Sequence, residues 1–195
     1  GISGAATLII TNSTISGNNA DLHGGGVFTT TATTTLTNVT VSNNRADNDN
    51  NGSGAGGGLG PVGGTVTLHN TIVAGNFNED GVTDARDDIN GTIDAAGTNN
   101  LIGYGTNMTG ITHGVNGNQV GTGGSPIDAM LGVLANNGGP TMTHALQPTS
   151  PAVETGSNTA ATNAGPKTRN NGMAKIAAVR KSGHVSATSQ ADPVR

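Results

Sequence analysis

Two short acidic loops carry the residue types that bind calcium in proteins. Each loop, DNDNNG at 47–52 and NFNEDG at 76–81, places carboxylate or amide side chains at alternating positions before a glycine. In calcium sites, oxygen atoms at alternate positions of such a loop face one ion. Calcium is therefore the one cofactor that the sequence suggests. The candidate ligands are Asp47, Asp49, Asn51, Asn76, Asn78, Asp80 and Asp87.

Neither loop completes the calcium-binding pattern. The twelfth position, where calcium loops place a bidentate Glu, is Gly58 in the first loop and the shorter Asp87 in the second. Because no helices are expected beside either loop, an EF-hand is excluded. A solvated polar loop without a metal is the alternative for both.

Carboxylates between residues 80 and 94 raise a second kind of chemistry, the cleavage of polysaccharides. Hydrolysis needs two carboxylates facing each other across the scissile bond. Elimination needs a base, for which Arg86 is the nearby choice. The carboxylates fall in one loop, and one Tyr, two Phe and no Trp leave no platform for sugar stacking, so we assign no catalytic residue and lean against an enzyme. The carboxylates weighed are Asp80, Asp84, Asp87, Asp88 and Asp94.

Composition excludes several other classes of protein. The absence of Cys excludes disulfides, thiol catalysis and Cys-ligated zinc. Arg45 and Arg86 are the only Lys or Arg residues before position 167, too few to neutralise a nucleic acid backbone. No run approaches the roughly 20 apolar residues that span a bilayer. With 32% hydrophobic and only 10% charged residues, the chain is expected to fold around a thin, regular core.

One motif occurs three times in the first half of the chain. LIITNSTISGNN at 8–19, TTLTNVTVSNNR at 34–45 and VTLHNTIVAGNF at 66–77 align without gaps. A glycine triplet and an apolar residue follow the first two copies, at 24–27 and 56–59. The alignment produces two apolar columns (Ile10, Leu36, Leu68; Ile15, Val41, Val73) and two asparagine columns (Asn12, Asn38, Asn70; Asn18, Asn44, Asn76).

Such short units cannot bury their own apolar side, so they must stack on one another as a solenoid. Strands of β-branched residues that turn at Asn and Gly favour a parallel β-helix, and parallel crossovers are right-handed by default. Stacked Asn side chains would lie about 4.8 Å apart and hydrogen bond to one another. We therefore predict an all-β, right-handed parallel β-helix, with coils over 1–100 and a C-terminal segment over 101–157 that caps the open end.

The motifs resemble known bacterial surface proteins. NSTISGNNA followed by GGGV is similar to the right-handed β-helix repeats of polymorphic outer-membrane-protein-like proteins. The ordered string NTIVAGN, NNLIG, VGT, PID, LANNGGPT and THALQPTSPAVETG resembles large secreted β-helix proteins of the choice-of-anchor Q domain type. The resemblance covers roughly residues 6–156. It implies an exported or surface-attached protein and no common catalytic reaction.

The last part of the chain, 158–195, departs from that family. An Asp-Gln-Arg-Gly segment and an Ile-Gly-Ala motif, usual there, are absent. The possible codons of residues 161–165 encode Asp-Gln-Arg-Gly if the reading frame starts at the third base of each codon. The same frame shift over residues 180–184 permits Glu-Ile-Gly-Ala. We hypothesise a shifted reading frame from about residue 158, and a natural basic, disordered tail is the alternative.

Taken together, these patterns favour a non-catalytic structural or adhesive region of a secreted or surface-displayed bacterial β-helix protein. We expect an extracellular or outer-membrane-associated location, after removal of a signal or as an internal fragment. The expected partners are extracellular or cell-surface polysaccharides or a surface protein, with no nucleic acid and no membrane-spanning segment. The alternative function is a carbohydrate-active lyase-like or hydrolase-like fragment whose cleft lies mostly outside this chain.

Overall fold

The computed structural model describes residues 1–162 except 5–6, 31–32, 62 and 80–83. The described residues are almost entirely in strands and turns, with one short helix, α1 (Asn158–Thr162). No helix among them is long and apolar enough to cross a membrane. The predicted basic tail, apart from α1, lies outside the described residues.

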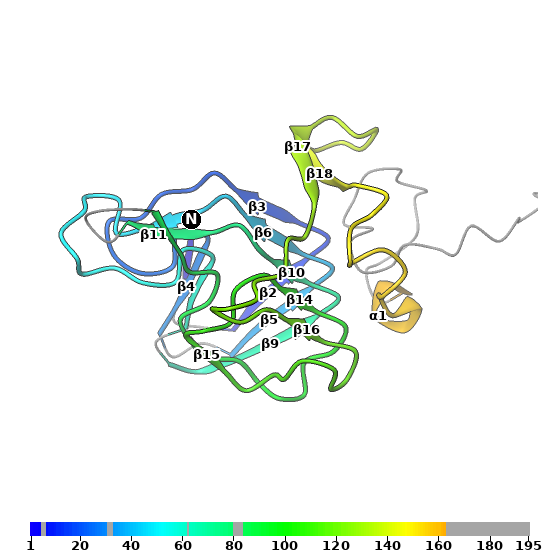
Figure 1. The fold of residues 1–195 in the computed structure, drawn as a ribbon, viewed down its shortest axis with the longest axis horizontal. Helices are drawn as coiled ribbons and strands as arrows, with labels where there is room; N and C mark the ends of the chain where they lie inside the picture. Colours follow the sequence, from blue (N-terminus) through cyan, green and yellow to red (C-terminus); the bar gives the residue numbers. More distant parts are fainter. Residues whose placement is uncertain (5–6, 31–32, 62, 80–83, 163–195) are drawn as a thin grey trace, which may run out of the picture.

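Three parallel sheets form the body of the protein (Figure 1). The first contains β1 (Ile2–Gly4), β4 (Val27–Thr29) and β8 (Leu59–Pro61). The second contains β2 (Leu8–Thr11), β5 (Thr33–Thr37) and β9 (Thr65–His69). The third contains β3 (Thr14–Ser16), β6 (Thr40–Ser42), β10 (Ile72–Val73), β14 (Leu101–Ile102) and β16 (Gln119–Val120). The chain thus passes through the same three sheets in the same order three times, which confirms the predicted all-β class with parallel strands.

Smaller sheets flank these three. Strand β11 (Phe77–Glu79) pairs in parallel with β7 (Arg45–Ala46) and antiparallel with β12 (Asp84–Arg86). A parallel pair joins β13 (Gly91–Thr92) to β15 (Met108–Thr109), and an antiparallel hairpin joins β17 (Leu131–Ala135) to β18 (Thr143–Leu146). The predicted boundary between residues 100 and 101 falls inside the third large sheet, because β14 and β16 extend it.

The strand register aligns the apolar columns found in the sequence. Ile10 pairs with Leu36, and Leu36 pairs with Leu68. Ile15 and Val73 flank Val41 in the same way in the third sheet. These side chains belong to one buried cluster, in which Leu36, Leu68, Val41 and Val73 have no exposed surface. Burial of one apolar residue per strand in each column explains why the sequence repeats and why the core is thin.

The glycine triplets allow backbone to pack on backbone. A Cβ atom on Gly25 would overlap the carbonyl oxygen of Arg45, and one on Gly57 would overlap that of Phe77. The second glycine of each triplet therefore lies directly against the small sheet of β7, β11 and β12, which we call the flank sheet. Any side chain at either position would push these layers apart.

The C-terminal segment packs against the outer face of the third sheet. A second apolar cluster lies between them and contains Ile72, Ala74, Leu101, Ala129 and Ala152. Farther along, backbone carbonyls of this segment accept hydrogen bonds from a row of side-chain amides on successive coils. The donors and acceptors are Gln119 to Pro151, Asn99 to Thr155, Asn70 to Ser157 and Asn38 to Ala160. The segment was expected to cover the open end of the stack, whereas these contacts run along its side, where Figure 1 also places the β17–β18 hairpin.

Candidate functional site

A ladder of asparagine side chains leads to the candidate site. Asn18 donates both its backbone N–H and its Nδ2 to Oδ1 of Asn44, at 3.0 and 2.9 Å. Asn44 donates in the same way to Asn76, at 3.0 and 2.9 Å. Asn76 then donates twice to Oδ1 of Asp88, both at 2.8 Å. The predicted asparagine column is therefore a continuous hydrogen-bonded ladder, and a carboxylate ends it.

Asp88 suits this place because donors face both of its oxygens. Oδ2 accepts the backbone N–H of Tyr104 at 2.7 Å, while Oδ1 accepts the two bonds from Asn76. An asparagine here would turn its own amide toward the Tyr104 N–H. Burial raises the pKa of Asp88 to about 7, although the three N–H donors act in the opposite direction and nearby Asp87 adds to the rise.

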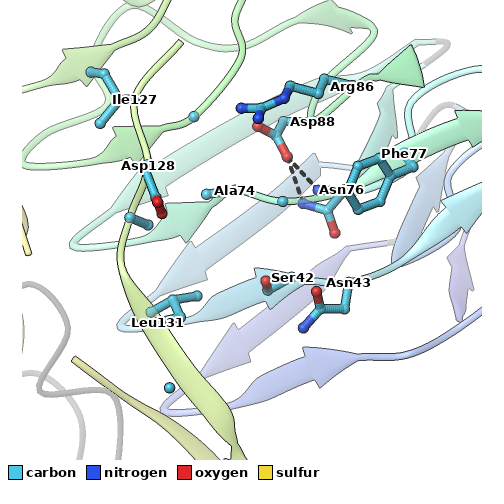
Figure 2. Close-up of a pocket in the computed structure, with 14 residues that line it drawn as sticks. Ser42, Asn43, Ala74, Asn76, Phe77, Arg86, Asp88, Ile127, Asp128 and Leu131 are labelled. Carbon is cyan, nitrogen blue, oxygen red and sulfur yellow. Dashed lines mark hydrogen bonds between the residues drawn. The ribbon is translucent and has the colours of Figure 1, made fainter. Parts of the chain in front are cut away.

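A cavity of about 240 Å³ opens beside Asp88, and we call it the corner cavity (Figure 2). One wall comes from the turn after β10 and from the flank sheet, and the other comes from the C-terminal segment. Asp128, on that second wall, is exposed and lies across the cavity from Asn76, and its Oδ1 accepts the Met130 N–H at 2.7 Å. The lining residues used below are Asn76, Phe77, Arg86, Asp88 and Asp128.

Phe77 lies between the two arginines of the body. Its register partner on β7 is Arg45, and its partner on β12 is Arg86. Arg45 forms an ion pair with Glu79, with Nη1 and Oε2 3.0 Å apart. Arg86 is exposed, lines the corner cavity and forms no ion pair with a described residue. The cavity is thus bordered by one ring and by one guanidinium that forms no ion pair with the part of the chain described.

Among the carboxylates considered for catalysis, the three whose side chains the structure describes, Asp87, Asp88 and Asp94, do not converge on one point. Asp88 lines the corner cavity, whereas Asp87 accepts the Gly56 N–H at 2.7 Å and an Nδ2 bond from Asn107 at 3.2 Å. Asp94 accepts the Thr67 hydroxyl and the Ala96 N–H. Asp84 begins β12, and Asp80 lies outside the described residues.

In the first candidate calcium loop, the side chains hydrogen bond within the loop. Asp47 has no exposed surface, and its carboxylate accepts backbone N–H groups from residues 51, 52 and 53 at 3.2, 2.9 and 3.3 Å. Asn51 donates to Asp49 at 2.7 Å. Asp47 therefore organises the turn, and Asp49 is the exposed carboxylate of this loop.

The second candidate calcium loop is divided between different structural roles. Asn76 belongs to the ladder, Asp87 binds Gly56 and Asn107, and Asn78 donates to the Gly54 carbonyl at 3.1 Å. That last bond joins Asn78 to the chain two residues after the first loop ends. In the described part of the chain, no three His, Cys, Asp or Glu side chains are grouped so that they could hold a metal ion. The calcium hypothesis stays a prediction.

A serine–histidine pair attaches the C-terminal hairpin to the first repeat. His144 is buried, and its Nδ1 lies 2.7 Å from the Gly132 carbonyl oxygen, to which it must donate. In a neutral ring, Nε2 then accepts the Ser16 hydroxyl, 2.8 Å away. The backbone N–H groups next to Ser16 are already bonded, that of Gly17 to the Asn43 carbonyl and that of Asn18 to Asn44. They cannot form an oxyanion hole, so the pair is a structural contact.

Sequence reasoning named Arg86 and Asp88 but missed Phe77 and Asp128 as their neighbours in a cavity. Asp128 is far from both in sequence, and nothing in the PID tripeptide that contains it marks a site. Antiparallel pairing of β11 with β12 brings Phe77 beside Arg86, and these three-residue strands are too short to show a periodic pattern in the sequence.

Comparisons of the chain with models of known protein families, with curated proteins and with solved structures found no match. The chemistry of the corner cavity is therefore interpreted from its own geometry.

Proposed function

We propose that the chain is a non-catalytic, structural or adhesive part of a secreted or surface-displayed bacterial protein, built as a right-handed parallel β-helix. The resemblance of its repeats to choice-of-anchor Q and polymorphic outer-membrane-protein-like proteins supports the family, the bacterial source and the outer-membrane or extracellular location. The chain's passage three times through the same three parallel sheets supports the solenoid.

The observation that carries a structural role is the use made of the polar side chains. The buried side chains of Asn44, Asn76 and Asp88 form hydrogen bonds with one another and with neighbouring backbone groups. Each such bond contributes about 0.5–1.5 kcal/mol, and leaving one unmade costs more. These residues therefore hold strands in register, which is what a stalk requires.

Two measurements test this proposal. The purified chain, incubated with neutral and acidic polysaccharides with and without calcium, is expected to release neither reducing ends nor unsaturated products. Protease added to intact source cells is expected to remove the protein, because it lies outside the cell. Turnover that is lost in Asp88→Ala, or full protection of the protein in intact cells, would overturn the proposal.

A carbohydrate-active fragment is the second candidate, and one observation favours it. Asp88 lines the corner cavity with a pKa of about 7, which suits a general acid, and Asp128 supplies another carboxylate on the opposite wall. Three N–H donors already occupy the oxygens of Asp88, and only 2% of its surface is exposed. This arrangement supports the ladder role over proton donation to a substrate.

A further inference from the structure

We propose that the corner cavity binds one sugar residue of a neutral saccharide, held by Arg86, Asp128 and Phe77. This inference rests on the adhesive half of the proposed function and gives it a site and a ligand class. It requires binding without cleavage.

The cavity has the size and composition of a small subsite. Its volume of about 240 Å³ is just below the roughly 300–1,000 Å³ of typical small-molecule pockets, so it suits a single ring of a longer chain. One wall belongs to the rigid strand stack, and the other belongs to the C-terminal segment, which the second apolar cluster fixes in place. Residues on packed elements hold a ligand in a defined orientation.

The lining groups match the hydroxyl and carbon atoms of a sugar. A guanidinium only donates hydrogen bonds, and a carboxylate only accepts them, whereas every sugar hydroxyl does both. Arg86 and the Asp128 carboxylate, of which one oxygen already accepts the Met130 N–H, can therefore bind different hydroxyls of one ring. The composition led us to expect no aromatic platform for a sugar, but Phe77 lines the cavity on the same side as Arg86 and offers an apolar face to the C–H groups of the ring.

Charge decides between a neutral and an acidic ligand. Arg86 and Asp128 have opposite charges, so their contributions cancel within the cavity. Asp88 adds a further acidic group beneath them, and the chain as a whole carries a formal net charge of −4. A uronate or sulfated sugar would meet more negative than positive charge, whereas a neutral sugar would meet no repulsion.

The partly neutralised Arg45 provides a matched control. It lies beside Phe77 at the same register as Arg86, but it is paired with Glu79 and does not line the cavity. Arg45→Ala therefore removes an arginine from the same small sheet without removing a residue that lines the cavity. Because Arg86 is exposed, Arg86→Ala is expected to leave the fold intact, and circular dichroism checks this for each variant.

The test is isothermal titration of the full chain with cello-, malto- and galacto-oligosaccharides, and with oligogalacturonate as the acidic probe. We expect millimolar or tighter binding of at least one neutral oligosaccharide and weaker binding of the uronate. Arg86→Ala and Asp128→Ala should each weaken binding about tenfold or more, because each removes a charged hydrogen-bonding group, and Arg45→Ala should not.

The other results overturn the inference. These are no binding of any neutral probe by the folded chain, stronger binding of the uronate, or equal losses in Arg45→Ala and Arg86→Ala. Failure of the inference leaves the structural role intact. Conversely, cleavage of a bound neutral saccharide would sink the non-catalytic proposal while the site itself stands.

Discussion

Asp88→Asn keeps the shape of the side chain that ends the ladder and removes its charge and one acceptor. The new Oδ1 can still accept the two bonds from Asn76, but Nδ2 would face the backbone N–H of Tyr104. Two donors then meet in a buried place. Leaving a buried donor unpaired costs about 1–3 kcal/mol, so Asp88→Asn should lower the free energy of unfolding.

The pH dependence of that loss follows from the pKa of Asp88. Burial raises this pKa from 3.8 to about 7 in the folded protein. Because the folded value is the higher one, its contribution to stability is fully present below a pH of about 4 and is lost as the pH rises through about 7. About three pKa units at about 1.4 kcal/mol each set an upper limit of about 4 kcal/mol. Asp88→Asn lacks this titration, so the stability advantage of the wild type over Asp88→Asn should shrink as the pH rises, and it reverses once the lost contribution exceeds the about 1–3 kcal/mol of the unpaired donor.

Urea unfolding between pH 4 and pH 8, followed by far-ultraviolet circular dichroism, measures this difference. Other acidic groups titrate in both proteins, so subtracting the two profiles isolates Asp88. Asp21→Asn is the control, because Asp21 is exposed and takes no part in the ladder. Parallel profiles for the wild type and Asp88→Asn would refute the argument that a buried, protonated Asp88 stabilises the fold at low pH.

Four further results are expected. Gly57→Ala should destabilise the protein by about 1–3 kcal/mol in urea unfolding, since the added methyl overlaps the carbonyl of Phe77. Asn44→Ala should cost about 1–3 kcal/mol for each ladder donor left unpaired, whereas Asn48→Ala, at an exposed position, should have little effect. If the first acidic loop binds calcium, we expect a dissociation constant of roughly 10⁻⁴ to 10⁻³ M. Millimolar calcium should then raise the melting temperature, and Asp49→Ala should reduce that rise. Equal melting temperatures in calcium and in chelator would show that the loop is a solvated turn. Far-ultraviolet circular dichroism should show β structure, and helix above about a third of the residues would contradict the parallel sheets.

The sequence predicts the parts of the fold that repeat. Ile10, Leu36 and Leu68 align in the chain because they occupy equivalent places in neighbouring strands, and the structure pairs them in that register. The asparagine column is predictable for the same reason, because the backbone N–H at the turn of each repeat needs a hydrogen-bond acceptor. Each repeat must bury an apolar side chain and bond its turn, and the three aligned copies are enough to show both requirements in the sequence.

The parts that do not repeat were not predictable in this way. Asp88 joins the ladder only 12 residues after Asn76, although the earlier steps are 26 and 32 residues, so no fixed period identifies it. The position of the C-terminal segment depends on Ile72 and Leu101, which face outward from the third sheet and are covered by this segment. Their contact with it produces no repeating pattern in the sequence. Asp128 reaches the corner cavity only as a consequence of that packing, and so the cavity itself could not be predicted.

The ladder that ends on Asp88 also has an electrical direction. Every side-chain amide in it donates toward Asp88 and accepts from the opposite side, so the amide dipoles are aligned, as in an α-helix. A carboxylate stands at the end where N–H groups point outward. An ionised carboxylate has the sign that stabilises aligned dipoles at this end, and each hydrogen bond polarises the next. The stack therefore behaves as a polar filament whose two ends are electrostatically distinct: the Asn18 end attracts a donor or a cation, and the Asp88 end requires an acceptor.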